Sequence, residues 1–210
     1  MSRWSVIALR ATALAAVLVS SPAFAHHVMG GKMPSTFGAG ILSGLGHPIL
    51  GLDHLAAIVA VGCLAAAFPA GALLAVGFVV AMLVGVSLHV AAVTIPASEA
   101  LVALSVIALG AVLILRRAPS QVLVGVLLLA AGLFHGYALG ESIAGAEPTP
   151  LTAYFIGLAI IQSAIALGVM FVVRALAHPR AGEIAAVRLI GAGVVGVGCA
   201  ALMAQIVPAV

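Results

Sequence analysis

Charge is what this sequence of 210 residues has least of. Only 6% of its residues are charged, eight Lys and Arg against five Asp and Glu, whereas 65% are hydrophobic. Soluble domains carry about 25% charged residues. This balance excludes a sizeable water-soluble domain and a basic surface for nucleic acid. We therefore expect an all-α membrane protein whose main surroundings are the lipid bilayer, in which each intramembrane ionisable residue is a functional candidate.

Cysteine and aromatic residues are also scarce. Cys63 and Cys199 are the only cysteines, and both lie in apolar runs, where a buried small side chain is the expected role. Two such residues exclude a disulfide framework. Seven Phe, two Tyr and one Trp give little surface on which to pack a haem macrocycle. We expect no permanently bound cofactor.

The amino-terminal segment has the pattern of an export signal. Arg3 and Arg10 precede an apolar stretch over 11–19, and Ala23-Phe24-Ala25 forms a small-x-small cleavage site. The apolar stretch is shorter than the roughly 20 residues that a spanning helix needs. We predict a cleavable signal peptide at 1–25, a periplasmic tail with histidines at 26–36 and a transmembrane domain at 37–210.

Six apolar stretches predict a six-helix transmembrane bundle, with spans at 37–67, 70–92, 97–115, 122–144, 151–173 and 185–207. With an outside amino terminus, the arginines beyond the signal all fall on the cytoplasmic side: Arg116, Arg117, Arg174, Arg180 and Arg188. The outer connections instead hold Glu99 and Glu147, as the positive-inside rule requires. We predict a multi-pass protein of the bacterial inner (plasma) membrane whose mature amino terminus is periplasmic.

Small residues at four-residue spacing predict where the helices pack closely. Such stripes occur at Gly40 and Gly44 in the first span and at Gly132, Gly136 and Gly140 in the fourth. A third stripe in the sixth span consists of Ala192, Gly196 and Ala200.

A first polar cluster lies inside the first span. His47, Asp53 and His54 are separated by Pro48 and Gly51, so we expect the helix to be kinked or partly unwound there. Asp53 is the only aspartate of the chain. A carboxylate beside a histidine commonly orients a metal-bound imidazole. The simpler alternative is a buried His–Asp pair that locks helices together.

A second polar cluster, His135 and Glu141, lies in the fourth span. Because the spans alternate in direction, His135 is expected at the depth of His54, and Glu141 at the depth of His89 near the outer end of the second span. His26 and His27 at the new amino terminus form a chelating group with the α-amine, or simply follow the cleavage site. Gln162 and Ser163 add oxygen ligands or bond between helices. The complete predicted metal column is His26, His27, His89, His47, Glu141, Asp53, His54 and His135.

Imidazole and carboxylate ligands suit Ni²⁺, Co²⁺ or Zn²⁺, and the lack of clustered thiolates and thioethers argues against Cu⁺. The sequence has no G-x-x-x-x-G-K-[ST] phosphate loop. A divalent ion entering a negative interior gains about 4.6 kcal/mol per 100 mV, which is enough to drive uptake. These features are compatible with uptake of a divalent metal ion by a secondary transporter.

The H-x5-D-H pattern of His47, Asp53 and His54, the stretch from Phe134 to Ala138 and the six-span layout resemble the HupE/UreJ family of bacterial nickel permeases. The resemblance covers essentially the whole mature chain. It implies Ni²⁺ uptake for hydrogenase or urease, metallochaperones of those enzymes as partners, and functional roles for the three motif residues and His135. Leu139 stands where the family's second motif has another His, and Glu141 comes one residue early. This departure puts Co²⁺ beside Ni²⁺ as the substrate.

Two other functions fit the same residues. Three His and an Asp could hold a catalytic Zn²⁺ in an intramembrane hydrolase with Glu141 as the base, although no H-E-x-x-H helix is present. A non-transporting membrane metallochaperone or assembly protein would need only the binding site. We predict a transporter and not an enzyme.

Overall fold

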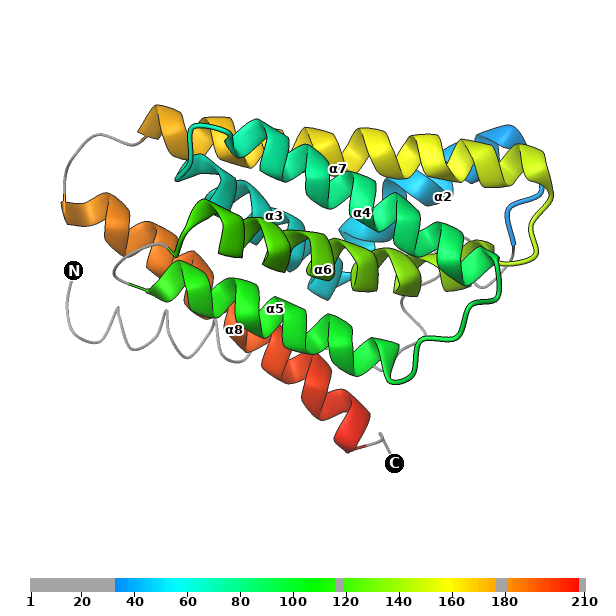
Figure 1. The fold of residues 1–210 in the computed structure, drawn as a ribbon. Coiled ribbons are helices and arrows are strands. Elements are labelled where there is room, and N and C mark those ends of the chain that lie inside the picture. Colours follow the sequence, from blue (N-terminus) through cyan, green and yellow to red (C-terminus); the bar gives the residue numbers. More distant parts are fainter. Residues whose placement is uncertain (1–32, 116–118, 177–180, 208–210) are drawn as a thin grey trace, which may run out of the picture.

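A computed structural model describes residues 33–115, 119–176 and 181–207, with the side chains of 181–185 left aside. Every regular element of this part is helical (Figure 1). The elements are α2 (Phe37–Leu50), α3 (Leu52–Ala66), α4 (Gly71–Val90), α5 (Ser98–Ile114), α6 (Gln121–Gly140), the 3₁₀ turn η2 (Glu141–Ile143), α7 (Pro148–Leu176) and α8 (Ala181–Ile206). The predicted signal peptide, His26, His27, Arg116, Arg117 and Arg180 lie outside the described residues.

The helices confirm a multi-pass membrane protein. Four segments are long and apolar enough to cross a bilayer: Gly71–Val90, Gln121–Ile143, Pro148–Leu176 and Ala186–Ile206. The pair α2 and α3 makes a fifth candidate if the two helices form one broken span. Helix α5 is apolar but shorter, with 17 residues. Large apolar side chains such as Leu73, Val122 and Leu189 are exposed on the outside, as lipid contact requires.

The first predicted span is broken where the sequence indicated. Helix α2 contains Pro48 and ends at Leu50, Gly51 separates the helices, and α3 leaves at 79° to α2. The N–H of Gly51 donates to the carbonyl of His47 at 3.0 Å, and the carbonyl of Gly51 accepts from Leu55 at 2.9 Å. The backbone therefore stays hydrogen-bonded through the bend, which a chain in lipid requires.

The bundle is built from pairs of helices in close contact, chiefly α4 with α6, α5 with α8, and α2 and α3 with α7 (Figure 1). Glycine permits two of these approaches. A Cβ on Gly136 would lie 1.9 Å from the carbonyl oxygen of Met82, and one on Gly44 would lie 2.3 Å from that of Tyr154. The small-residue stripes predicted in the first and fourth spans are thus confirmed as packing faces.

The stripe predicted for the sixth span is wrong. Helix α8 packs on α5 through Gly191, Val194 and Gly198, which are buried. Ala192 is exposed, and a Cβ on Gly196 would meet nothing within 4 Å. The helix carries small residues on more than one side, and the side chosen is the one that fits Gly110 and Ile107 of α5.

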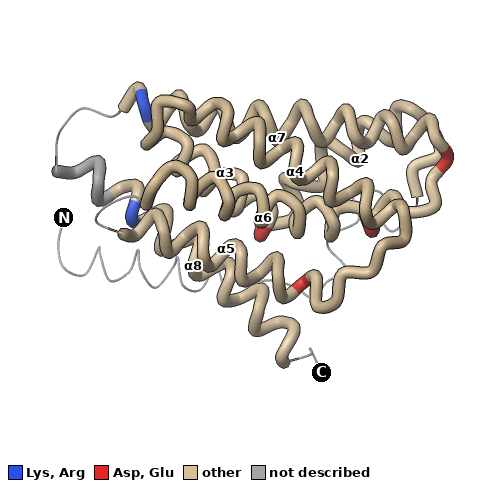
Figure 2. Tube along the Cα trace, in the orientation of Figure 1, with Lys and Arg blue, Asp and Glu red and all other residues tan. Residues whose placement is uncertain are grey.

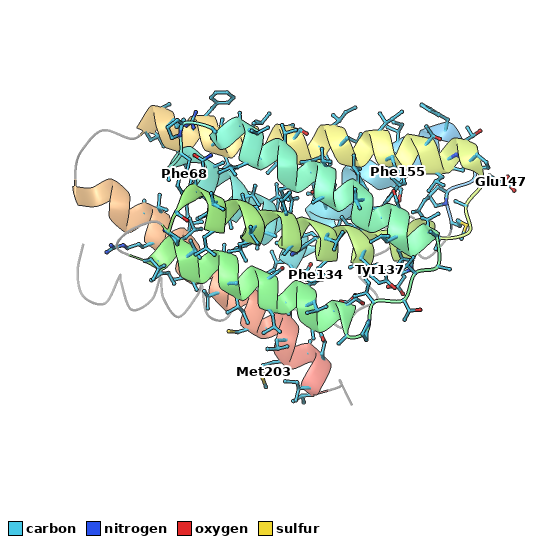
Figure 3. All side chains as sticks on the ribbon, viewed as in Figure 1. Phe68, Phe134, Tyr137, Glu147, Phe155 and Met203 are labelled. Carbon is cyan, nitrogen blue, oxygen red and sulfur yellow. The ribbon has the colours of Figure 1, made fainter. Side chains whose placement is uncertain are left out.

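The described charges are separated along the bundle. Figure 2 shows basic positions at the end where α7 finishes and α8 begins, and acidic positions nearer the middle or the opposite end. The basic residues described in these two helices are Arg174 and Arg188. Arg174 donates to the carbonyls of Ala65, Ala66 and Phe68 at the carboxyl end of α3. A cation is favourable at a helix carboxyl end, which carries partial negative charge. Glu147 protrudes from the far end (Figure 3).

Candidate metal-ion site

Three histidines from three helices meet inside the bundle. His47 of α2 is 4% exposed, His54 of α3 is 5% exposed, and His135 of α6 is 2% exposed. The ring centroids of His47 and His54 are 6.0 Å apart, and those of His54 and His135 are 5.0 Å apart. The bend at Gly51 brings the first two rings together, since it turns the start of α3 back towards α2. The structure therefore joins the imidazoles that the two sequence clusters predicted to converge.

The hydrogen bonds around His135 assign its tautomer. Ser105 donates its hydroxyl proton to the carbonyl of Val102 at 2.7 Å, so its oxygen accepts from Nε2–H of His135 at 3.1 Å. Nδ1 of His135 then carries a lone pair, which accepts from Nδ1–H of His54 at 2.7 Å. In this donor order the neutral ring of His54 keeps the lone pair on its Nε2.

His47 is oriented by two hydroxyl groups. Its Nδ1 lies 3.0 Å from Oγ of Ser142 and 3.1 Å from the hydroxyl oxygen of Tyr154. Tyr154 donates to the carbonyl of Leu139 at 2.8 Å, and Ser142 donates to the same carbonyl at 3.1 Å. Because both hydroxyl protons point to the carbonyl of Leu139, Nδ1–H of His47 donates to the hydroxyl oxygens of Ser142 and Tyr154. This is the kind of outer hydrogen bond that fixes the ring of a metal-binding histidine.

Asp53 lies at the start of α3, where an acidic side chain is favourable because the helix amino end is partially positive. Its Oδ1 accepts from the backbone N–H of His54 at 2.9 Å. The carboxylate is half-buried. The negative charge predicted beside the imidazoles is therefore placed next to His54.

The remaining predicted residues lie apart from the three imidazoles. Helix α6 ends at Gly140, and Glu141 is exposed in η2. His89, in the last turn of α4, lies beside Gly140 at the same height, as predicted, with its ring 4.6 Å from that of Tyr137. Its Nδ1 is buried and accepts or donates no hydrogen bond among the described residues.

Among the residues that the structure describes, no three His, Cys, Asp or Glu side chains stand together at metal-ligand spacing. His54 and His135 are joined through their Nδ1 atoms, so these nitrogens are engaged with each other. A metal ion would therefore use Nε2 of His54 first, or separate the two rings.

Tyr137, in the second motif, ties down the connection between α4 and α5. Its hydroxyl donates to the carbonyl of Val93 at 2.9 Å and accepts from the N–H of Ile95 at 3.2 Å. The same connection holds Ala92 and Ala97 at φ of 58° and 54°. Left-handed backbone costs a residue with a Cβ about 1 kcal/mol, so the tyrosine contacts stabilise a strained turn. Figure 3 shows Tyr137 beside this connection.

Gln162 of α7 is fully buried and donates to the sulfur of Met82 on α4. Gln162 therefore forms a hydrogen bond between helices, which is one of the two roles that the sequence suggests for it. Ser105, Ser142 and Tyr154 are not among the candidate site residues predicted from the sequence. One feature of the sequence indicates a role for Tyr154: a tyrosine inside an apolar span needs a hydrogen-bond partner for its hydroxyl.

Comparison with known proteins identifies the family of the chain. A family model described as HupE / UreJ protein matches residues 14–201. The chain is 32% identical over 196 residues to Protein HupE of Rhizobium leguminosarum bv. viciae, covering 91% of this chain and 96% of that protein. No solved structure matches.

The chain therefore belongs to the HupE/UreJ family. This family is associated with nickel uptake for hydrogenase and urease, and it is a family of transporters and not of enzymes. Membership argues against the intramembrane hydrolase considered from the sequence.

Proposed function

We propose that this protein carries divalent transition-metal ions inward across the bacterial inner membrane, with Ni²⁺ as the main substrate and Co²⁺ as the second. The observation that carries the proposal is the group of three buried imidazoles from three helices, held by hydroxyl partners beside the only aspartate. A histidine with a purely structural role needs a hydrogen bond at only one of its two ring nitrogens. Here hydroxyl groups outside the cluster orient the rings of His47 and His135, which is how metal-binding histidines are commonly prepared.

The cluster has the chemistry that a divalent ion needs inside lipid. Neutral imidazole is a good ligand for Ni²⁺ and Co²⁺, and it carries no charge that burial would penalise. Asp53 supplies one negative charge beside His54. A bare ion at the bilayer centre costs many kcal/mol, so ligands that replace its water are required for passage.

We further propose that the bond between His54 and His135 closes the path when no ion is present. An arriving ion first meets Nε2 of His54, and binding of a second imidazole requires the two rings to separate. Gly51 lies directly before α3, and the 79° bend there gives α3 a point about which to turn. Opening the imidazole pair would then release the ion towards the inner side.

The proposed topology has six spans with a periplasmic amino terminus. Helix α5, with 17 residues, is about 26 Å long and completes the count with α2–α3, α4, α6, α7 and α8. Arg174 and Arg188 at one end support placing that end in the cytoplasm. The export signal at 1–25 supports the same orientation.

At the outer face we propose that His89 and Glu141 receive the ion, together with His26 and His27 on the tail. The buried Nδ1 of His89, which no described residue satisfies, supports its part in this step. On the inner side we propose that metallochaperones of hydrogenase or urease take the ion.

The test is accumulation of ⁶³Ni²⁺ and of Co²⁺ in cells that express the native chain or its Asp53→Ala and His54→Ala variants. We expect both variants to lose at least tenfold in uptake at normal membrane levels. Ser87→Ala is the control, because Ser87 is exposed on α4 and bonds only to its own helix at Leu83. Undiminished uptake in both variants would reject the transport assignment.

A further inference from the structure

A large apolar groove lies away from the imidazoles, at the basic end of the bundle. Its volume is about 890 Å³, within the range of ligand pockets. It lies between α3, α5, α7 and α8, and its walls include Cys63, Leu64, Val112, Gly168, Val172 and Arg188. Within the described ranges, α7 and α8 both face the interior helices but make almost no contact with each other, so the groove is open between them.

One group in this apolar wall needs a polar partner. Arg188 is the charged residue of the lining, and its Nε is buried without a hydrogen-bond partner in the part of the chain described. Arg174, the other arginine described at this end, already donates to three carbonyls. A buried guanidinium N–H without an acceptor is unfavourable, and phosphate is the acceptor whose geometry guanidinium fits best.

The length of the groove matches one leaflet. Along α7 its lining runs from Leu176 at the basic end up to Ala164, which is 12 residues or about 18 Å of helix. Half of a hydrocarbon core of about 30 Å is about 15 Å. An acyl chain whose headgroup sits at Arg188 would therefore fill the groove and end near the middle of the membrane.

We infer that this groove is the binding site of one anionic phospholipid of the leaflet on the arginine side. The phosphate pairs with Arg188, and an acyl chain lies along Gly168 and Val172 of α7 against Cys63 and Leu64 of α3. The lipid then completes the packing between α7 and α8. This inference goes beyond ion transport and does not depend on it.

Gly168 allows the groove to be filled without disturbing the backbone, since a Cβ there would meet nothing within 4 Å. Gly168→Phe is thus expected to occupy the acyl position. Gly193→Phe is the matched control, because Gly193 is exposed on α8, outside the groove, and its Cβ position is equally open. Arg188→Gln removes the charge, and Arg188→Lys retains it.

The experiment is native mass spectrometry of the full chain released from bilayers of equal phosphatidylglycerol and phosphatidylcholine. We expect one retained lipid per native chain, with phosphatidylglycerol enriched severalfold. Gly168→Phe should lose the lipid, Arg188→Gln should lose the preference, and Gly193→Phe and Arg188→Lys should match the native chain.

Equal retention by Gly168→Phe and Gly193→Phe would overturn the inference, as would a native chain without lipid. A lipid-free dimer would overturn it in favour of a second copy in the groove. If Arg188→Gln fails to fold, the two phenylalanine variants still decide whether the groove holds the lipid.

Discussion

The start of α7 lies against α2, whereas the later parts of α3 and α7 also border an open apolar groove. Near the start of α7, Tyr154 and Gly157 press against α2, and His54 at the start of α3 is locked to α6. Towards the other end, Cys63 and Gly168 face an open apolar groove. The imidazole cluster and its hydroxyl partners lie in the half away from the groove. Lipid gives no hydrophobic drive for helices to associate. Helices therefore pack closely where side-chain orientation matters, and the proposed lipid fills the groove.

A pair of glycines gives the largest expected contrast between the halves. Gly136→Ala would place a Cβ 1.9 Å from the carbonyl oxygen of Met82, so α6 must move away from α4 and carry His135 with it. We expect a loss of about 1–3 kcal/mol in stability and most of the uptake. Gly168→Ala, with open space, should be neutral or up to about 1 kcal/mol stabilising. Thermal unfolding of the purified variants measures both. Equal losses would contradict the contrast.

Ser105 tests whether outer hydrogen bonds prepare the imidazoles. Ser105→Ala removes the acceptor of Nε2–H of His135. The tautomer of His135 that lets its Nδ1 accept from His54 is then no longer fixed. A buried unsatisfied N–H costs about 1–3 kcal/mol, so we expect uptake to fall about tenfold. Ser105→Thr keeps a hydroxyl and should restore uptake. A threonine variant as poor as the alanine variant would show that the serine matters only for packing.

Tyr154→Phe is expected to have a smaller effect. His47 would keep Ser142 as a partner and lose one of two hydroxyl contacts. A neutral hydrogen bond contributes about 1 kcal/mol, which corresponds to about fivefold weaker ion affinity. Uptake measured over a range of Ni²⁺ concentrations should show a higher half-saturating concentration with little change in the maximal rate. A lower maximal rate alone would argue against a role in ion binding.

The smallest expected effect is a change of metal preference at Leu139. Its side chain is 1% exposed in the core, while its carbonyl accepts from Tyr154 and Ser142. Leu139→His should raise the ratio of Ni²⁺ to Co²⁺ uptake by about two- to threefold, because it adds an imidazole at the position of the second His in the usual family motif. Leu139→Met is the control for volume. An unchanged ratio would show that this position does not set selectivity.

The helices could be predicted from the sequence because their ends are marked by strong signals. Pro69, Pro96 and Pro119 lie close to helix ends in the structure, and the break at Gly51 follows from Pro48 and Gly51 themselves. The imidazoles could also be predicted, since an ionisable group inside an apolar run is rare and costly.

Other features depend on tertiary contacts. The sequence predicts Glu141 within the fourth span, but α6 ends at Gly140 and the 3₁₀ turn leaves Glu141 exposed while Ser142 contacts His47. The sequence does not predict which face of α8 packs against α5, because small residues occur on more than one side of the helix. The contacts of Gly191 and Gly198 with α5 determine that face. Serine hydroxyls carry no periodic signal, so the role of Ser105 required the structure.

Ion flux into proteoliposomes is the most direct test of the central claim that the imidazole cluster is the ion path. Vesicles with an imposed inside-negative potential and a trapped metal-sensitive dye would report Ni²⁺ entry through the native chain, His54→Ala, His135→Ala and Ser87→Ala. The account predicts entry through the native and Ser87→Ala proteins and at least tenfold slower entry through both histidine variants. Equal entry through all four proteins would contradict it.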